Sequence, residues 1–234
     1  MNTATIASRI DHTILKPEAS SADVLRLCDE ALEYGFASVC VNGRFVREAA
    51  AHLQGRVRVC GVAGFPLGAM KPMIKGIEAA SLVKDGASEV DFVAFLPALM
   101  AGDLEAARAD FLEVTKNVRA VLPQTVVKVI LETGALMQGV SEDQAEARIA
   151  CGCLAARESG CDFVKTSTGF HAAGGATEAA VKLLKKHAGP LQVKASGGIR
   201  NLADAKLMLA AGATRLGCSS GVAIAKGETG TAGY

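Results

Sequence analysis

Tryptophan is absent from this chain, and aromatic residues make up only 4% of its 234 residues. An aromatic platform on which nucleic-acid bases could stack is therefore not expected. Charge of one sign is not in excess either, because 25 Lys and Arg residues against 24 Asp and Glu residues leave a net charge of +1. A nearly neutral chain gives no electrostatic reason to bind nucleic acid or an acidic membrane surface.

Long apolar runs and metal-binding spacings are missing as well. No stretch approaches the roughly 20 apolar residues that a membrane span needs, and residues 1–13 lack the pattern of a secretory signal. The four histidines show no H-x-x-x-H spacing and the seven cysteines no C-x-x-C, so we expect no metal site. Most cysteines lie in apolar runs, which favours free, buried thiols in a reducing cytoplasm.

What the sequence does contain is a repeated alternation of strand-like and helix-like segments. Eight short, mostly apolar runs are typical of parallel strands covered on both faces. They span residues 9–15, 36–41, 57–65, 89–95, 126–132, 162–167, 191–196 and 214–220. Amphipathic segments follow them, with helix starts expected at Asp103 and at the Ser141–Gln144 capping box, and helix ends at Gly35 and Gly212.

This alternation predicts the fold. Eight strand–helix units match the size of a (β/α)₈ TIM barrel, an α/β fold. No Ser/Pro-rich linker or block of charge divides the chain. We therefore expect one barrel domain over residues 1–234, with residues 227–234 as a flexible C-terminal tail. An open doubly wound sheet would have fewer strands and often a Gly-rich loop after the first strand, and that loop is absent here.

Four consecutive strand-like runs carry a charged residue among apolar neighbours: Asp91, Lys128, Lys165 and Lys194. Active sites of TIM barrels lie at the C-terminal ends of the strands. Neighbouring strands are about 4.8 Å apart, so these side chains can converge if they face the interior. A lysine can also point outward with its ammonium in solvent, and for Lys128 this alternative stays open.

Two neighbouring buried lysines, Lys165 and Lys194, predict catalysis by an amine nucleophile. A free lysine is protonated at neutral pH and cannot attack a carbonyl, but burial and a second cation both disfavour the ammonium form. The neutral amine can form a carbinolamine and then a Schiff base, which weakens an adjacent C–C bond. Asp91 is a candidate proton carrier or a salt-bridge partner of one lysine, and the two roles are compatible.

Three Gly- and Ser-rich turns follow late strands, at residues 165–169, 195–199 and 217–221. Backbone N–H groups at such turns bind phosphate, and TIM barrels often place this site after strands 7 and 8. Any one of these glycines is equally explained as an ordinary turn residue. Their recurrence on successive strands favours a phosphate site that includes Gly197, Gly198, Ser219 and Ser220.

The same segments carry a resemblance to a known family. FVKTSTGF, GGAT and VKASGGIR occur in order with IDHTILKP, GFPLG, EVD, KVILETG and GCSSG, from residue 10 to residue 226. Together they resemble the deoxyribose-phosphate aldolases, which are class I aldolases. The resemblance implies a TIM barrel without metal or organic cofactor. It also implies reversible cleavage of 2-deoxy-D-ribose 5-phosphate to D-glyceraldehyde 3-phosphate and acetaldehyde in deoxynucleoside catabolism.

The resemblance also implies roles for individual residues. Lys165 matches the Schiff-base lysine, Lys194 the lysine that perturbs it, and Asp91 the proton-transfer carboxylate. The remaining residues expected to contact the substrate are Asp11, Thr13, Lys128, Thr166, Gly169, Gly197, Gly198, Ser219 and Ser220. The implied partners are small phosphorylated sugars and aldehydes, without nucleic acid or membrane, and copies of the same chain in a homodimer or larger oligomer in the cytoplasm.

Two positions and two other functions stay open. Phe170 stands where some family members have a lysine near the phosphate. The last residue is Tyr234. Some family members also end in a tyrosine, which is thought to assist proton transfer, although a disordered terminus is the plainer interpretation. The alternative functions are a Schiff-base aldolase for another sugar phosphate or small aldehyde, and a non-catalytic barrel that binds a phosphate ligand. The paired Lys165 and Lys194 argue against the last.

Overall fold

A computed structural model describes residues 3–230 of the chain. Eight parallel strands form a closed barrel in chain order, and the last strand pairs back onto the first. They are β1 (Ile10–Ile14), β2 (Ser38–Asn42), β3 (Arg58–Ala63), β4 (Glu89–Val93), β5 (Val126–Ile130), β6 (Phe163–Lys165), β7 (Gln192–Ser196) and β8 (Arg215–Cys218). The predicted TIM barrel and its eight strands are confirmed.

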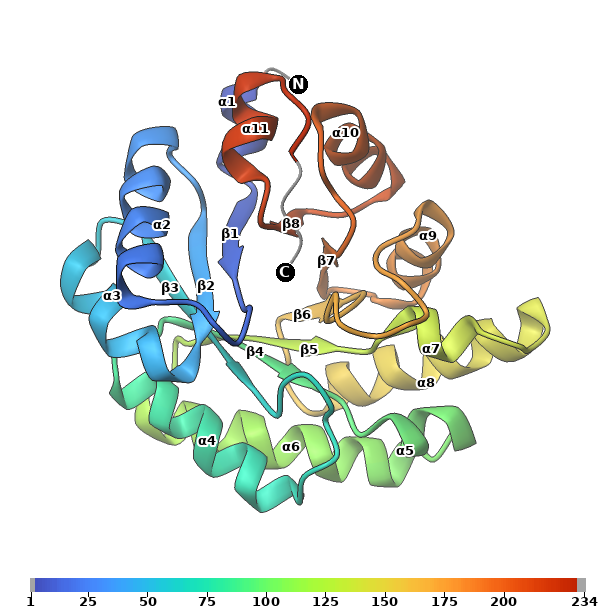
Figure 1. The fold of residues 1–234 in the computed structure, drawn as a ribbon. Coiled ribbons are helices and arrows are strands. Elements are labelled where there is room, and N and C mark those ends of the chain that lie inside the picture. The colour runs from blue at the N-terminus through green and yellow to red at the C-terminus, as the bar shows by residue number, and fades with distance from the viewer. Residues whose placement is uncertain (1–2, 231–234) are drawn as a thin grey trace.

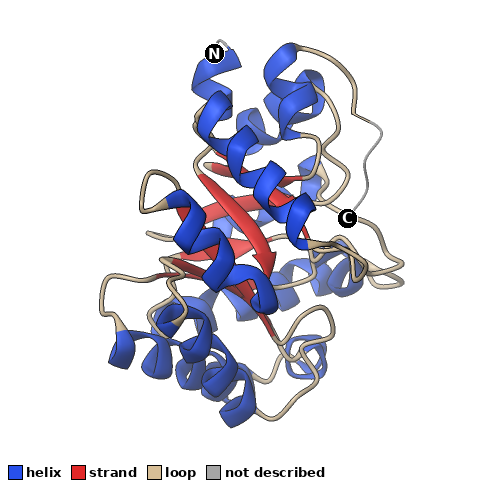
Figure 2. Ribbon diagram, turned by 60° about the vertical axis from the view of Figure 1, so that its left-hand side comes forward, coloured by secondary structure: helices blue, strands red, loops and turns tan. Residues whose placement is uncertain are grey.

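Helices surround the strands on the outside of the barrel (Figures 1 and 2). They are α1 (Thr3–Ala7), α2 (Ser21–Tyr34), η1 (Gly43–Phe45), α3 (Val46–Leu53), α4 (Pro72–Lys84), α5 (Leu96–Ala101), α6 (Leu104–Val121), α7 (Thr133–Met137), α8 (Glu142–Glu158), α9 (Glu178–His187), α10 (Leu202–Ala211) and α11 (Gly221–Lys226). Within residues 3–230, no helix combines the length and the apolar character that crossing a membrane requires.

Local signals in the sequence fix where several helices begin and end. The Ser141 side chain accepts the N–H of Gln144, whose own side chain accepts the N–H of Ser141, so the predicted capping box opens α8. Asp103 starts α6 by accepting the N–H of Ala106 at 3.0 Å. At the end of α2, Gly35 has a φ of 67°, a left-handed conformation that favours glycine.

The barrel separates an apolar outer layer from a charged interior. Val90 and Phe92 of β4 are fully buried in the main core, which packs the strands against the helices. Asp91 lies between them and therefore faces the interior. The interior also holds a small apolar cluster, formed by Leu15, Cys40, Cys60 and Val62. All seven cysteines are free, as expected.

One buried ion pair outside the barrel ties α4 to α6. The Lys75 ammonium lies 2.8 and 2.7 Å from the two carboxylate oxygens of Asp110, and both side chains are buried. Asp110 also accepts the N–H of Phe95 in the loop that follows β4. Lys75 packs under Gly64, where an added Cβ would lie 3.1 Å from the lysine Cε. The pair therefore supports the loops after both β3 and β4.

Replacing Lys75 by methionine is expected to lower the free energy of unfolding by about 3 to 5 kcal/mol, because it leaves the Asp110 carboxylate buried without a cation. The double variant Lys75→Met/Asp110→Leu should recover most of this loss, since apolar side chains then fill the same space. Urea unfolding of both variants measures the difference. A double variant no more stable than the single one would contradict the expectation.

Candidate active site

The four charged strand residues singled out in the sequence meet inside the barrel. Asp91 lies at the centre. Its Oδ1 accepts from the Lys128 ammonium at 2.9 Å, and its Oδ2 accepts from Lys165 at 2.9 Å and Lys194 at 2.8 Å. Asp91 pairs with Lys128 in strand register, and Lys165 pairs with Lys194. All four side chains are buried, so the charges interact with little screening by water.

Three further charged residues complete the arrangement. The Arg215 guanidinium lies 2.6 Å from Asp11 Oδ1 and 3.2 Å from Glu89 Oε2. Asp11 Oδ2 also lies 2.5 Å from the Lys194 ammonium, and Glu89 Oε2 lies 2.6 Å from the Lys128 ammonium. The result is a closed ring of alternating charge, called here the charged ring: Asp11, Lys194, Asp91, Lys128, Glu89 and Arg215.

The ring members hold one another in their ionised forms. Burial raises the pKa of Asp91, but the coulombic attraction of Lys128, Lys165 and Lys194 outweighs it and holds the pKa well below its usual range. For Lys194, burial lowers the pKa, and the attraction of Asp11 and Asp91 overrides it and raises the pKa well above the usual range. Lys194 therefore carries a positive charge throughout the neutral pH range.

Lys165 is outside the ring and ends β6, on the C-terminal side of the barrel. Its side chain is 3% exposed, and it shares Asp91 Oδ2 with Lys194. Lys165 thus lies at a strand end, next to Asp91 and in register with Lys194. Its predicted role as the amine nucleophile stays a prediction.

The loop after β6 is held by a residue that sequence analysis missed. Glu132 is 1% exposed and has a φ of 54°, an uncommon left-handed conformation for a residue other than glycine. Its carboxylate accepts both the N–H and the hydroxyl of Thr168, the latter at 2.5 Å. Burial raises the pKa of Glu132. The available signal was a charged residue at the end of a strand-like run, the same signal that marked the lysines.

Two predicted contact residues have structural partners of their own. Thr166 accepts the N–H of Ser196 at 3.0 Å and donates to its carbonyl at 3.3 Å, so it joins the ends of β6 and β7. Thr13 donates to the carbonyl of Asp11 at 2.8 Å. Both side chains are buried. Whether Thr166 and Thr13 contact the substrate stays a prediction.

The glycine-rich turns after β6 and β7 touch through their backbones. Gly197 and Gly198 have φ values of 85° and 80°. A Cβ on Gly175 would lie 2.3 Å from the carbonyl oxygen of Gly197, and a Cβ on Gly197 would lie 3.4 Å from the Cα of Gly169. Only glycine allows this approach. The contact brings the predicted phosphate turns of two strands together.

The turn after β8 adjoins the same region. Ser220 is 5% exposed, and its hydroxyl has no hydrogen-bond partner among residues 3–230. Gly230 donates its N–H to the carbonyl of Arg200 at 2.8 Å, and a Cβ on Gly230 would lie 2.3 Å from Ser220 Oγ. Residue 230 thus lies against the turns after β7 and β8. Tyr234 lies outside the described residues.

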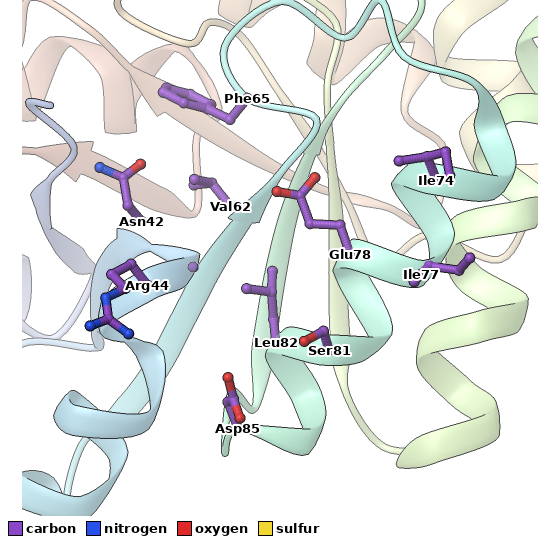
Figure 3. A pocket seen from close by; sticks show the side chains of 11 residues that line it. Asn42, Arg44, Val62, Phe65, Ile74, Ile77, Glu78, Ser81, Leu82 and Asp85 are labelled. Atoms are coloured by element: carbon purple, nitrogen blue, oxygen red, sulfur yellow. The ribbon is translucent and has the colours of Figure 1, made fainter.

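Phe170 follows the predicted phosphate turn after β6 and packs edge-on against Phe65, with 5.2 Å between ring centroids. Phe65 also lines a surface cavity of about 560 Å³ that lies between β2, β3 and α4 (Figure 3). Glu78 of α4 lines the same cavity and accepts the N–H of Gly64 at 2.8 Å, which anchors the loop that carries Phe65. The charged ring does not line this cavity.

One group of side chains in the interior has the composition of a metal site. Cys40, Cys60 and Asp91 place their ligand atoms within 4.8 Å of one another. The Asp91 oxygens, however, already accept from three lysines, and Cys60 Sγ lies 3.2 Å from Asp91 Oδ1. The protein's own cations therefore occupy the carboxylate that a metal would need.

Comparison with known proteins places this geometry in a family. A family model described as DeoC/LacD family aldolase matches residues 5–227. The chain belongs to this family. As a DeoC/LacD aldolase it is 46% identical, over 232 residues, to the deoxyribose-phosphate aldolase of Halalkalibacterium halodurans, with 98% of each chain covered. It is 49% identical to that of Carboxydothermus hydrogenoformans over 224 residues, which cover 95% of this chain and 94% of the relative.

A solved structure of the same kind is also similar to this DeoC/LacD aldolase. The deoxyribose phosphate aldolase from Aeropyrum pernix, described as having a unique tetrameric structure, superposes with a TM-score of 0.86 at 33% identity. The match covers 96% of this chain and 91% of that one. The resemblance inferred from the sequence motifs is confirmed.

Proposed function

We propose that this chain is a class I aldolase that reversibly cleaves 2-deoxy-D-ribose 5-phosphate to D-glyceraldehyde 3-phosphate and acetaldehyde, with Lys165 as the Schiff-base lysine. One observation carries the proposal: Lys165 and Lys194 lie in register on neighbouring strands, both buried, and share one oxygen of Asp91. The relatives from H. halodurans and C. hydrogenoformans bear the name of this activity.

The chemistry follows from an amine held beside a permanent cation. The neutral Lys165 amine adds to the C1 aldehyde of the open-chain sugar, and loss of water gives the iminium ion. A base removes the proton of the C3 hydroxyl, the C2–C3 bond breaks, and its electron pair moves into the iminium to form an enamine. C3 becomes the aldehyde of glyceraldehyde 3-phosphate. Protonation at C2 and hydrolysis release acetaldehyde and regenerate the amine.

The neighbouring side chains supply charge and proton transfer in this scheme. Lys194 keeps a positive charge next to the amine and favours its neutral form. Asp91 accepts hydrogen bonds from both lysines and is held ionised by them, so its carboxylate orients the two nitrogens. Its predicted role in proton transfer stays a prediction. Lys128 is fully buried between Asp91 and Glu89. Its predicted contact with the substrate stays a prediction, as does the role of Tyr234.

The substrate phosphate is assigned to the turns that contain Gly169, Gly197, Gly198, Ser219 and Ser220. Support comes from the backbone contact between the β6 and β7 turns and from the buried Ser220 hydroxyl, which lacks a partner among the described residues. Backbone N–H groups at such turns favour an anion.

Replacing Phe170 by lysine is expected to raise the preference for 2-deoxyribose 5-phosphate over 2-deoxyribose about tenfold in kcat/KM, because a cation is added beside the turns. The gain should shrink as salt is added. Phe170→Met, which stays apolar, is the matched control and should leave the preference nearly unchanged. Equal effects of both variants would place the phosphate elsewhere.

Steady-state cleavage of 2-deoxyribose 5-phosphate, with glyceraldehyde 3-phosphate measured as product, tests the proposed function. A Schiff-base aldolase of another substrate would form a borohydride-stable adduct with acetaldehyde yet cleave a different sugar phosphate faster. A barrel that only binds phosphate ligands would form no adduct. Rapid cleavage together with the adduct is the expected result.

We also propose that the chain acts as a single-domain homo-oligomer in the cytoplasm. The Aeropyrum pernix relative is described as tetrameric, and α4 exposes apolar side chains at Met73, Ile74 and Ile77. Seven free thiols are compatible with a reducing compartment. Sedimentation velocity of the purified chain tests the oligomeric state, and a monomer at micromolar concentration would contradict it.

A further inference from the structure

The charged ring has a simple charge balance. Three cations alternate with three carboxylates around the ring. The nitrogen of each cation lies between 2.5 and 3.2 Å from an oxygen of each neighbouring carboxylate. The three positive and three negative charges cancel. Lys165 is not a member of the ring, but its ammonium lies 2.9 Å from Asp91 Oδ2. A proton on Lys165 would therefore add a positive charge to a buried ring that is already neutral, which is unfavourable.

Two ring members, Glu89 and Arg215, have no ion pair with Lys165 among the described residues. Arg215 shares a register row with Lys194 and Lys165, and Lys194 lies between them. Glu89 begins β4, two residues before Asp91. Their ion pairs reach Lys165 only through other ring members: those of Arg215 through Asp11 and Lys194, those of Glu89 through Lys128, and both finally through Asp91. They therefore act on the Lys165 nitrogen only through intervening charges.

The other titratable groups around Lys165 are unchanged by substitutions at Arg215 and Glu89. Burial raises the pKa of the Cys60 thiol, which donates to Asp91. The pKa of the neighbouring Cys40 thiol is lowered by its contact with Cys60 and by the charges of Lys194 and Lys165. Glu132, in the loop after β5, interacts electrostatically with His171 and Lys165, and Thr168 holds its carboxylate. Arg58 reaches Glu89 at 3.3 Å, but its side chain is 59% exposed.

We propose that Arg215 and Glu89 are positioning residues that set the protonation state of Lys165 without an ion pair to it, by fixing the charge of the ring. Arg215 supplies the third cation. Without it the three carboxylates face only Lys128 and Lys194, and a protonated Lys165 becomes the ion that restores neutrality. Without the charge of Glu89 the ring is positive, and a proton on Lys165 is disfavoured further. The two substitutions therefore act in opposite directions.

The test measures the pH dependence of imine formation. Each protein is mixed with acetaldehyde for a fixed short time at a series of pH values, then quenched with borohydride at one common pH, and the modified Lys165 peptide is quantified by mass spectrometry. In Arg215→Met the acid limb of the profile should move up by about one pH unit, and in Glu89→Gln down by about one. The double variant has a neutral ring and should return close to the wild-type profile.

Two further variants separate charge from shape. Arg215→Lys keeps the charge and should keep the position of the acid limb even if the protein becomes less stable. Arg58→Gln removes a contact to the same Glu89, but from an exposed side chain, and should leave the profile in place. If Arg215→Met does not fold, the downward shift in Glu89→Gln and its reversal in the double variant decide the question.

The outcomes separate this proposal from the function on which it rests. If wild-type Lys165 forms no adduct, the proposed Schiff-base function fails. If wild-type Lys165 forms the adduct but both single variants lose rate equally at every pH, or shift in the same direction, the proposal for Arg215 and Glu89 is overturned. Opposite shifts that cancel in the double variant support it.

Discussion

Replacing Lys165 by methionine is expected to reduce cleavage of 2-deoxyribose 5-phosphate by about 10⁴-fold or more, because no other amine then stands ready to form the imine. In the wild-type enzyme, borohydride in the presence of acetaldehyde should convert the Lys165 amine to its ethyl derivative. Peptide mass analysis locates the added ethyl group. The methionine variant should remain unlabelled under the same conditions.

Two controls make this result specific. Lys182→Met removes an exposed lysine on α9 that pairs with Glu178, and should leave both cleavage and labelling unchanged. Thermal unfolding of Lys165→Met shows whether the barrel survives; it should, because the charged ring does not include Lys165. An ethyl group found on Lys194 or Lys128 in the wild-type protein would assign the nucleophile to that residue instead.

Replacing Lys194 by leucine is expected to move the acid limb of the kcat/KM profile up by about two pH units, with a loss of about 10²-fold at neutral pH. Two effects act in the same direction. The like charge next to Lys165 disappears, and the ring is left with three carboxylates and two cations, so a proton on Lys165 becomes favourable. Because the pKa of Lys194 itself lies well above the usual range, the wild-type profile contains no step from its titration near neutrality.

The shape of the profile distinguishes this role from substrate binding. If Lys194→Leu keeps the wild-type pH dependence and only raises KM, Lys194 is a binding group. Lys194→Arg is the informative companion, because it retains the positive charge and should leave the acid limb closer to that of the wild-type enzyme, whatever its effect on turnover. Activity of Lys194→Leu that recovers at alkaline pH would support the electrostatic role.

The fold could be predicted from the sequence because its signals are local and repeated. Eight apolar runs separated by amphipathic segments leave few alternatives to a closed barrel, and the caps at Asp103 and Ser141 need only neighbouring residues to form. The proximity of Lys165 and Lys194 was equally predictable, since each lysine interrupts an apolar run near a strand end.

The charged ring could not be predicted in the same way. Asp11 and Arg215 are 204 positions apart in the chain and meet only because β8 pairs with β1. Glu89 and Arg215 each begin a strand, where a charged residue is ordinarily a solvent-facing end. Only closure of the barrel turns both side chains inward and joins them. The role of Glu132 could not be predicted from the sequence for a related reason, because its partner Thr168 comes from the next strand-loop unit.

The charged ring also couples closure of the barrel to the electrostatics of the site. Asp11, Glu89, Asp91, Lys128 and Lys194 come from strands that precede β8, and β8 closes the barrel onto β1. Without β8, the carboxylates of Asp11 and Glu89 lack their shared guanidinium. Local opening of the barrel at β8 is therefore expected to change the charge around Lys165 before the other strands separate.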